Sequence, residues 1–276
     1  MPPVVVRPRT WLVLTIGSVA GLAMFLWPLL TSPRAGTAHN AEAPFIFVLI
    51  LPLIIAVVLA EMSSGGLDVK AIAMLGLLSG VGAALRPLGT GTAGIETVFF
   101  LLILAGRVYG PGFGFVLGST TMFASALLTG GVGPWLPFQM LAASWVGLGA
   151  GLLPQCRGRA EIALLATYGA VSAYVFGFLL NMWFWPFSLG TFIGAGAEPG
   201  LQFVPGDSVA SNLHRFLLFT FATSTLGWDT GRAITTVIAI ATLGTSVLAA
   251  LRRARRRVAF HPEVAFGPAG STDPVR

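Results

Sequence analysis

Long apolar stretches recur along the chain and leave little room for a water-exposed surface. They run over about residues 11–30, 44–61, 69–85, 95–108, 112–129, 135–153, 160–184 and 230–251. Most approach the roughly 20 residues that a helix needs to cross the hydrocarbon core of a bilayer. Only 9% of the residues are charged, whereas soluble domains carry roughly 25%. The sequence therefore predicts an all-α, polytopic membrane bundle of about eight transmembrane helices.

The arginines are unevenly distributed, and this gives the predicted bundle an orientation. Cytoplasmic loops of membrane proteins carry an excess of Lys and Arg. If the N-terminus is inside, the basic residues that remain outside are Arg34, Arg86, Arg215 and Arg232. We therefore expect both termini in the cytoplasm and a multi-pass protein of the bacterial cytoplasmic membrane. The run RRARRR, residues 252–257, is expected to anchor the last span at the anionic inner leaflet rather than to bind nucleic acid.

Three stretches fit this eight-span scheme less simply. Residues 95–108 are short for a span, and residues 213–228 form a further apolar stretch. We expect the second of these to lie at the outer surface, to dip into the membrane or to extend the last span. The first segment resembles a cleaved signal peptide in its basic residues before and small residues after, but its apolar run is long for one.

Motifs for catalysis and nucleotide binding are missing from the sequence. It contains no GxxxxGK[ST] phosphate loop, no GxSxG nucleophile elbow and no HExxH pair. The GxGxG runs at residues 110–114 and 147–151 fall inside apolar segments, where close helix packing explains them better than nucleotide binding. We therefore expect no enzymatic activity, no catalytic residues, no cofactor and no metal site.

Carboxylates are scarce at mid-membrane depth. Glu61, Glu96, Glu161 and Asp229 all fall near the ends of apolar segments. Transporters driven by protons or sodium place acidic residues inside their spans. The sequence therefore disfavours ion-driven transport by this chain alone.

The predicted helix over residues 69–85 carries small residues along one face. Ala73, Gly76, Gly80 and Ala84 follow one another at intervals of three and four residues. Small residues let helix backbones approach closely, and in lipid such packing drives association. The stripe therefore serves either ordinary packing within the chain or the docking of a partner membrane subunit.

An irregular stretch follows this helix at the predicted outer rim. Residues 86–96, RPLGTGTAGIE, end the span because proline and repeated glycine cannot continue a helix in lipid. Arg86, Thr90 and Glu96 offer polar groups there. The alternative interpretation is a plain surface turn with interfacial charges.

A second group of rim residues combines aromatic rings with polar anchors. In residues 130–140, GGVGPWLPFQM, Trp135 precedes Gln139, an amide that needs partners in lipid. The same depth is predicted for Asn181, Trp183 and Asp229. Aromatic walls with a few polar groups suit a small organic solute. The alternative is an aromatic belt together with a surface ion pair between Asp229 and Arg232.

Several of these pieces occur in an order typical of one protein family. In chain order they are the small-residue helix ending in Arg86-Pro87, FFLLILAGRVYGPGFGFVLGS (99–119), GGVGPWLPFQM (130–140), and NMWFWPF (181–187) followed by GWDTGRA (227–233). Over about residues 69–253 the chain resembles the substrate-binding S component of energy-coupling-factor (ECF) vitamin transporters. The resemblance implies a six-helix core over residues 67–253, a two-helix membrane extension over 1–66, and a basic, disordered cytoplasmic tail over 254–276.

The resemblance also implies a function. Such a subunit binds a vitamin with high affinity near the outer face and docks on a transmembrane coupling subunit, which two cytoplasmic ATPases drive. Docking would use the stripe of Ala73, Gly76, Gly80 and Ala84. The expected substrate-binding residues are Arg86, Thr90, Glu96, Trp135, Gln139, Asn181, Trp183 and Asp229. The Gly-Pro-Trp loop looks most like members assigned to cobalamin or to unassigned cargo, so cobalamin is the first candidate for the vitamin.

Three other functions stay open at this point. A self-sufficient secondary transporter would carry solute without an ATPase partner. A membrane enzyme acting on lipid would need clustered acids at the cytoplasmic face, where Glu61, Asp68 and Glu161 are spread apart. A structural subunit without ligand would need no more than the small-residue stripes.

Overall fold

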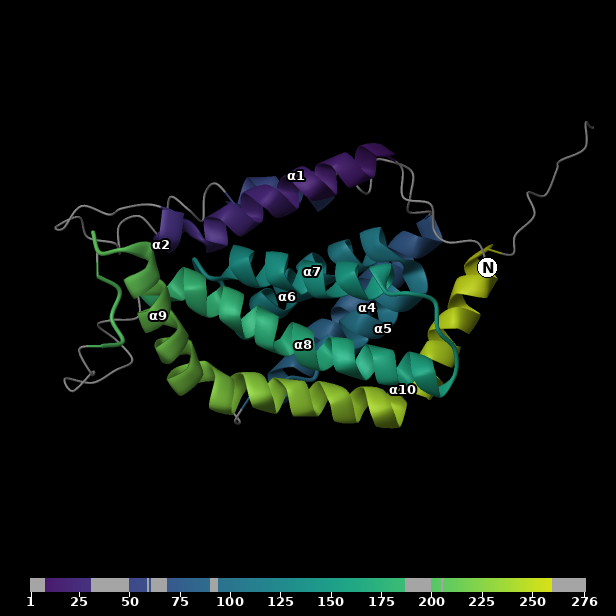
Figure 1. Cartoon of the computed structure of the whole chain (residues 1–276). Coiled ribbons are helices and arrows are strands. Elements are labelled where there is room, and N and C mark those ends of the chain that lie inside the picture. The colour runs from purple at the N-terminus through teal and green to yellow at the C-terminus, as the bar shows by residue number, and fades with distance from the viewer. Residues whose placement is uncertain are drawn as a thin grey trace, which may run out of the picture.

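The protein is a bundle of helices in the computed structural model (Figure 1), which describes residues 8–30, 50–58, 60, 69–89, 94–186, 200–204 and 206–259. The regular elements in this part of the chain are all helical. They are α1 (Pro8–Phe25), α2 (Trp27–Leu30), α4 (Val69–Leu85), η2 (Arg86–Leu88), α5 (Phe99–Tyr109), α6 (Pro111–Thr129), α7 (Leu136–Leu152), α8 (Arg159–Phe184), α9 (Val209–Thr220), η4 (Phe221–Asp229) and α10 (Thr230–Ala259). Residues 50–58 are helical as well. The all-α prediction is therefore confirmed for the described residues.

The described part of the chain has five helical runs that are long and apolar enough to cross a membrane. They are Pro8–Phe25, Lys70–Leu88, Pro111–Thr129, Arg159–Phe184 and Val209–Arg256. The helices α5 and α7 are apolar but shorter, and the predicted segment 44–61 is described only over residues 50–58 and 60. The chain is thus a multi-pass membrane protein, while the number of eight spans stays a prediction.

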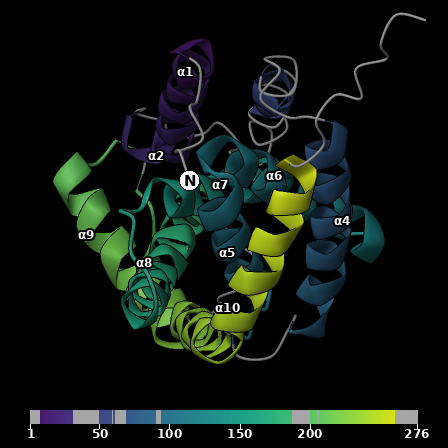
Figure 2. The ribbon, with the colours of Figure 1, turned by 90° about the vertical axis from the view of Figure 1, so that its right-hand side faces the viewer.

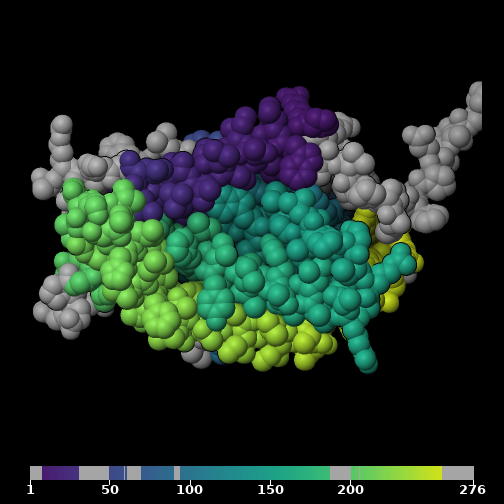
Figure 3. All heavy atoms as spheres, in the orientation of Figure 1, coloured from purple at the N-terminus to yellow at the C-terminus, as the bar shows by residue number. Residues whose placement is uncertain are grey.

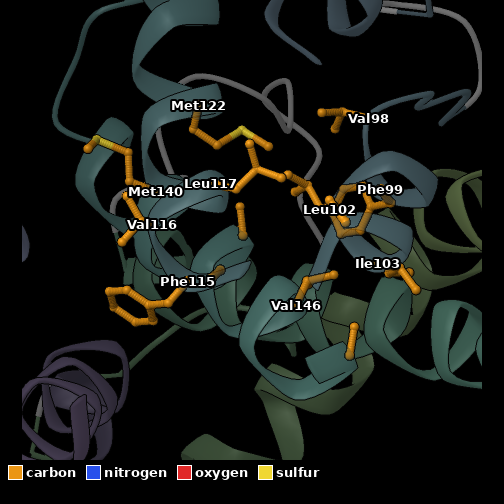
Figure 4. Packing of buried hydrophobic residues seen from close by; sticks show 14 of the residues in the cluster. Val98, Phe99, Leu102, Ile103, Phe115, Val116, Leu117, Met122, Met140 and Val146 are labelled. Carbon is orange, nitrogen blue, oxygen red and sulfur yellow. The ribbon is translucent and has the colours of Figure 1, made fainter. Parts of the chain in front are cut away.

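The short helix α5 lies at the centre of the bundle. Every residue from Leu101 to Val108 is buried, and α6, α7, α8 and α10 all contact this helix. Figure 4 shows Phe99, Leu102 and Ile103 among the buried side chains that α6 and α7 also contribute. An apolar segment that is shorter than a membrane span is thus covered by other helices instead of by lipid.

Close backbone contact joins α5, α6 and α7, and we call this contact the glycine seam. A Cβ atom added to Gly106 or Gly114 would overlap the backbone of Gly147. The same holds for Gly118 against Ala143 and for Gly151 against Pro111. Only glycine fits at such distances, so the interpretation of the two GxGxG runs as helix-packing motifs is confirmed.

The helix α4 lies at the edge of the bundle, as the view along the helices shows (Figure 2). Leu75, Leu78 and Ser79 are buried on the face that packs on the bundle, where the Ser79 and Thr120 hydroxyl oxygens are 2.7 Å apart. The predicted stripe of Ala73, Gly76, Gly80 and Ala84 lies on the opposite, exposed face. Added Cβ atoms at Gly76 and Gly80 would meet no atom within 4 Å in the part of the chain that the structure describes.

The helix α9 continues without interruption through η4 into α10. Ser208 begins it as an N-cap, and its hydroxyl oxygen accepts a hydrogen bond from the backbone N–H of Ser211. The run then changes direction, so that α9 stands across one end of the bundle while α10 lies along it (Figure 1). Residues 213–228 are thus continuous with the last span but turn away from its direction, and their depth in the membrane stays a prediction.

The helices α1 and α2 cover the face of the bundle formed by α7 and α8 (Figure 3). A Cβ atom at Gly17 of α1 would lie 2.8 Å from Val57 Cγ2, so α1 also packs against the helical stretch 50–58. The start of α1 and the end of α10 lie at the same end of the bundle (Figure 1). The termini themselves lie outside the described residues, and their place in the cytoplasm stays a prediction.

The basic run at the end of α10 is divided between two faces of the helix. Arg252 donates to both oxygens of Glu161, at 2.6 and 2.8 Å, and buried Arg107 donates to the same carboxylate at 2.9 Å. Arg255 donates to the carbonyl of Val108. Arg253 and Arg256 are exposed instead. The run thus fixes α10 to α8 and α5 with one face and leaves the other available to lipid headgroups.

Candidate functional site

Arg86 lies where the regular helix of α4 ends. Pro87 has no backbone N–H to continue the α-helix, so the chain passes into the short 3₁₀-helix η2. The hydroxyl of Thr97 donates to the carbonyl of Leu85 at 2.7 Å and holds the end of α4 in place. From this end, Arg86 Nη2 donates to Gln139 Oε1 of α7 at 3.1 Å, and Nη1 lies 3.5 Å from Ser125 Oγ of α6.

A chain of ion pairs continues from Arg86 to the start of α10. Arg86 Nε lies 3.8 Å from Glu96 Oε1, and Arg232 Nε donates to Glu96 Oε2 at 2.6 Å. Arg232 Nη1 donates to Asp229 Oδ1 at 2.9 Å. Together with Gln139 these residues form a continuous set that we call the Arg86 network.

Two glycines make room for this network. A Cβ atom at Gly177 of α8 would overlap the carboxylate of Asp229. Gly94 has a positive φ of 76°, and its Cα approaches the backbone of Trp228 so closely that a side chain would overlap it. The loop before α5 and the start of α10 are therefore held together by backbone contact as well as by ion pairs.

Aromatic rings flank the central guanidinium of the network. Arg232 Cζ lies 5.5 Å from the ring centroid of Phe99 and 5.0 Å from that of Phe176. Its Nη1 also lies 3.4 Å from the carbonyl oxygen of Ala173. Cation–π contacts of this kind strengthen where water is excluded. The rings therefore fix Arg232 between the two carboxylates.

Burial makes the balance of charges in the network important. The exposed side-chain fractions are 21% for Arg86, 15% for Glu96, 11% for Arg232 and 1% for Asp229. Removing one partner of a buried ion pair costs about 3–5 kcal/mol because a charge is left uncompensated. The four charges therefore depend on one another, and the predicted ion pair of Asp229 with Arg232 lies in the interior and not at the surface.

A π-helical stretch holds Asp229. In η4 the hydrogen bonds span five residues, and the hydroxyl of Ser224 reaches Asp229 Oδ2 at 2.9 Å. The hydroxyl of Thr230 donates to the carbonyl of Thr225 at 2.6 Å. Single π-type turns are frequent at functional sites, because they re-aim side chains at a cost in regular hydrogen bonding.

Two predicted site residues lie on the last turns of α8. Trp183 is 2% exposed, and its ring centroid lies 4.3 Å from that of Phe138, which precedes Gln139 in α7. The side-chain nitrogen of Asn181 is buried and has no hydrogen-bond partner among the described residues. Buried amide donors are normally satisfied, so this nitrogen is an exception among the described residues.

Trp135 and Thr90 stand apart from these residues. The indole of Trp135 is 42% exposed, donates to the carbonyl of Gly131 at 3.2 Å and lies over Gly133 of its own loop. Thr90 falls outside the described residues. The structure thus joins Arg86 directly to Gln139 and Glu96, links Asp229 to Glu96 through Arg232, and leaves Trp135 apart from them.

Three further residues of the site were not apparent from the sequence. Arg232 is predicted from sequence only as the surface partner of Asp229, although it bridges both carboxylates. Ser125 lies in α6 and Ser224 in η4, and in neither place does the sequence carry a local pattern that distinguishes them. Among the described residues, no group of three or more His, Cys, Asp or Glu side chains could hold a metal ion.

A comparison with protein families gives a match over more than half of the chain. A family model described as ECF transporter, substrate-specific component, matches residues 70–251. The match covers more than half of the 276 residues and starts at the second residue of α4. No curated protein and no solved structure matches the chain. The resemblance drawn from the sequence is thereby confirmed.

Proposed function

The chain belongs to the family of substrate-specific components of ECF transporters, and from this premise we propose that it captures a vitamin or related micronutrient at the outer face of the bacterial cytoplasmic membrane. Proteins of this family are substrate-binding subunits of ECF importers and not enzymes. Which solute binds, where it binds and how the subunit docks are the content of the proposal.

The Arg86 network is the observation that supports the location. It gathers polar groups from α4, α7, the loop before α5 and the start of α10 at a single end of the bundle. Charged groups inside a membrane bundle are costly and mark functional sites by default. This is also the end that the distribution of arginines assigns to the outside.

The proposed ligand combines a ring system with hydrogen-bonding groups. Gln139 and Arg86 would fix its polar groups, and Asn181 would donate to an acceptor through its buried nitrogen. Trp183 would contribute an aromatic wall. The full proposed set stays Arg86, Thr90, Glu96, Trp135, Gln139, Asn181, Trp183 and Asp229. Cobalamin remains the first candidate for the cargo, on the likeness of the Gly-Pro-Trp loop.

The exposed face of α4 is the proposed docking surface. Membership of the family implies pairing with an ECF module of membrane and ATPase subunits. Ala73, Gly76, Gly80 and Ala84 present a smooth exposed stripe. An approaching helix could come close to it because no described residue fills the space above the two glycines. Energy for import would come from that partner.

Cargo retention tests the proposal. The full chain is purified in mild detergent, and its bound small molecules are identified by mass spectrometry. Gln139→Ala removes the acceptor that fixes Arg86, and we expect it to lower retained cargo about ten- to a hundredfold, because hydrogen bonds to charged groups contribute about 1.5–3 kcal/mol. Trp135→Ala tests the loop, and Trp11→Ala, on a half-exposed tryptophan at the opposite end of the bundle, is the matched control.

Unchanged retention in both Gln139→Ala and Trp135→Ala would show that the site lies elsewhere. Purified wild-type protein that carries no solute and takes up substrate without an ATPase partner would instead support the secondary transporter. These two results separate an error in the site from an error in the function.

A further inference from the structure

The N-terminal helices α1 and α2 precede the region that defines the family, since the family match begins at residue 70. They nevertheless pack against helices inside that region. α1 contacts α8, and α2 contacts both α8 and α9. Figure 3 shows α1 and α2 lying lengthwise over one face of the bundle and reaching α9 at one end.

Specific contacts fix α1 on α7. The indole nitrogen of Trp145 donates to the hydroxyl of Ser18 at 2.9 Å. A Cβ atom at Gly21 would overlap the side chain of Leu141, so glycine at this position lets that side chain pack against α1. The helix is thus seated in one register on α7.

In this register Phe25 contacts two aromatic residues of α7, and one of them directly precedes Gln139. Phe25 is fully buried. Its ring lies edge-on to Phe138, with centroids 5.1 Å apart, and 5.6 Å from the ring of Trp145. Phe138 in turn lies 4.3 Å from Trp183. Phe25, Phe138 and Trp183 therefore form a continuous row of rings, and Gln139 is the residue next to the middle ring.

The segment around α2 packs against α8 and α9 at the end of the bundle where α8 ends. Leu26 and Leu29 pack against a second buried cluster that includes Met182, Trp185 and Phe216. Met182 and Trp185 flank Trp183 along the chain and come from the last turns of α8. The N-terminal segment thus contacts both sides of the segment that carries Asn181 and Trp183.

We infer that α1 and α2 are part of the substrate site, with Phe25 as a positioning residue that sets the planes of Phe138 and Trp183. The inference rests on the proposed function and deepens it by naming the ligand class. The row of rings ends at Trp183, and its middle ring, Phe138, directly precedes Gln139, which accepts a hydrogen bond from Arg86. Such rings together with these polar groups suit a planar heteroaromatic ring with polar substituents on one edge.

Titrations with five vitamins test this inference. Riboflavin, thiamine, biotin, folate and cobalamin are titrated separately into the detergent-purified full chain by calorimetry. With the vitamin that binds wild type most tightly, we expect Phe25→Ala to raise the Kd about tenfold, since an aromatic pair contributes about that factor beyond simple burial. Phe25→Leu keeps most of the volume without the flat ring and should raise the Kd by a smaller factor.

Leu14→Ala provides the matched control for a purely structural role. Leu14 is also buried in α1, at 2% exposure, but it lies eleven residues before Phe25, or about 16 Å along the helix. Its removal should lower the melting temperature as Phe25→Ala does and leave the Kd within about twofold of wild type. A rise in Kd that accompanies lost stability in both variants equally would overturn the positioning role.

The outcomes separate this inference from the proposed function. If Gln139→Ala weakens vitamin binding while folded Phe25→Ala and Phe25→Leu bind as wild type does, the role of α1 is wrong and the proposed site stands. If Gln139→Ala binds normally, the proposed site is wrong. Riboflavin, thiamine and folate carry planar heteroaromatic rings, whereas biotin and the corrin of cobalamin do not. If wild type binds none of the five vitamins, or binds only biotin or cobalamin, the ligand class fails and the inference fails with it.

Discussion

The glycines of the seam and the glycines of α4 follow the same sequence pattern and have opposite surroundings. In the seam, Gly114 and Gly147 face each other so closely that neither has room for a methyl group. On α4, Gly76 and Gly80 have open space where a side chain would stand. On α4, the helix surface is smooth over two turns and has no close neighbour among the described residues, which suits the proposed docking of a partner helix. The spacing of small residues alone does not distinguish the two cases.

The largest effect is expected in the seam. Gly114→Leu would push α6 away from α5 and α7, and we expect it to lower the free energy of unfolding by more than about 3 kcal/mol, at or beyond the usual range for overpacking. The more moderate Gly114→Ala should cost about 1–3 kcal/mol. Thermal unfolding in detergent measures both. A normal melting temperature for Gly114→Leu would mean that the seam is not closed.

A pair of glycines within α4 sharpens the comparison. Gly82 is buried, and a Cβ atom there would lie 2.7 Å from Thr121 Cγ2, so Gly82→Leu should cost about 1–3 kcal/mol through overpacking. Gly80→Leu, half a turn away on the exposed face, should change stability by less than about 0.5 kcal/mol.

Gly82→Leu should have the larger effect on stability, whereas Gly80→Leu should have the larger effect on docking. Gly80→Leu should prevent co-purification with the coupling subunit while cargo binding stays normal, because the added side chain keeps the partner helix away. The docking surface is misassigned if Gly80→Leu and Gly76→Leu both co-purify with the module as wild type does.

A smaller effect is expected from the polar contact that fixes α4 to α6. Ser79→Ala removes the hydrogen bond with Thr120, and contacts of this type between membrane helices contribute about 0.6 kcal/mol on average. The predicted result is a slight fall in melting temperature without loss of docking. A loss of docking would show that the tilt of α4, and not only its exposed face, matters to the partner.

The smallest effect on stability is expected from the ion pair of Asp207 with Arg215, which lies away from both groups of glycines. The hydrogen bond from Arg215, at 2.6 Å, holds the pKa of Asp207 below its ordinary value. A lowered pKa in the folded state means that the stabilisation is complete above the unfolded pKa and is lost as the pH falls through the folded pKa. Melting temperatures of wild type and Asp207→Asn should therefore differ slightly at pH 7 and converge below about pH 4. A difference that persists at low pH would exclude this pair as its cause.

Much of the fold could be predicted from the sequence because a segment that spans lipid must be long, apolar and helical. Apolar length predicts most of the helices, and glycine spacing predicts close packing at the seam. The short segment around residues 95–108 shows the limit: composition alone does not tell a thinly embedded helix from α5, which the other helices surround. The continuity of α9 with α10 depends on the π-helical stretch η4, for which the sequence offers no distinct signal.

The candidate site was predictable as a set of residue types at one depth, but not as a network. Membrane topology places Arg86, Glu96, Gln139 and Asp229 at one rim, and the structure joins them. The bridging position of Arg232 could not be predicted, because it depends on Gly177 and Gly94 leaving space for neighbouring segments. The indole of Trp135 turns back on its own loop for a local reason, since two glycines give it a flat surface.

The Arg86 network balances its own charges, and this has an electrical consequence. Two guanidinium groups face two carboxylates, so the set as a whole carries no net charge. An elementary charge that crosses the full membrane potential gains or loses about 2.3 kcal/mol per 100 mV. A neutral set that moves as one body gains or loses nothing. Filling the site with an uncharged nutrient would therefore proceed equally well in a fully energised cell and in one whose membrane voltage has collapsed.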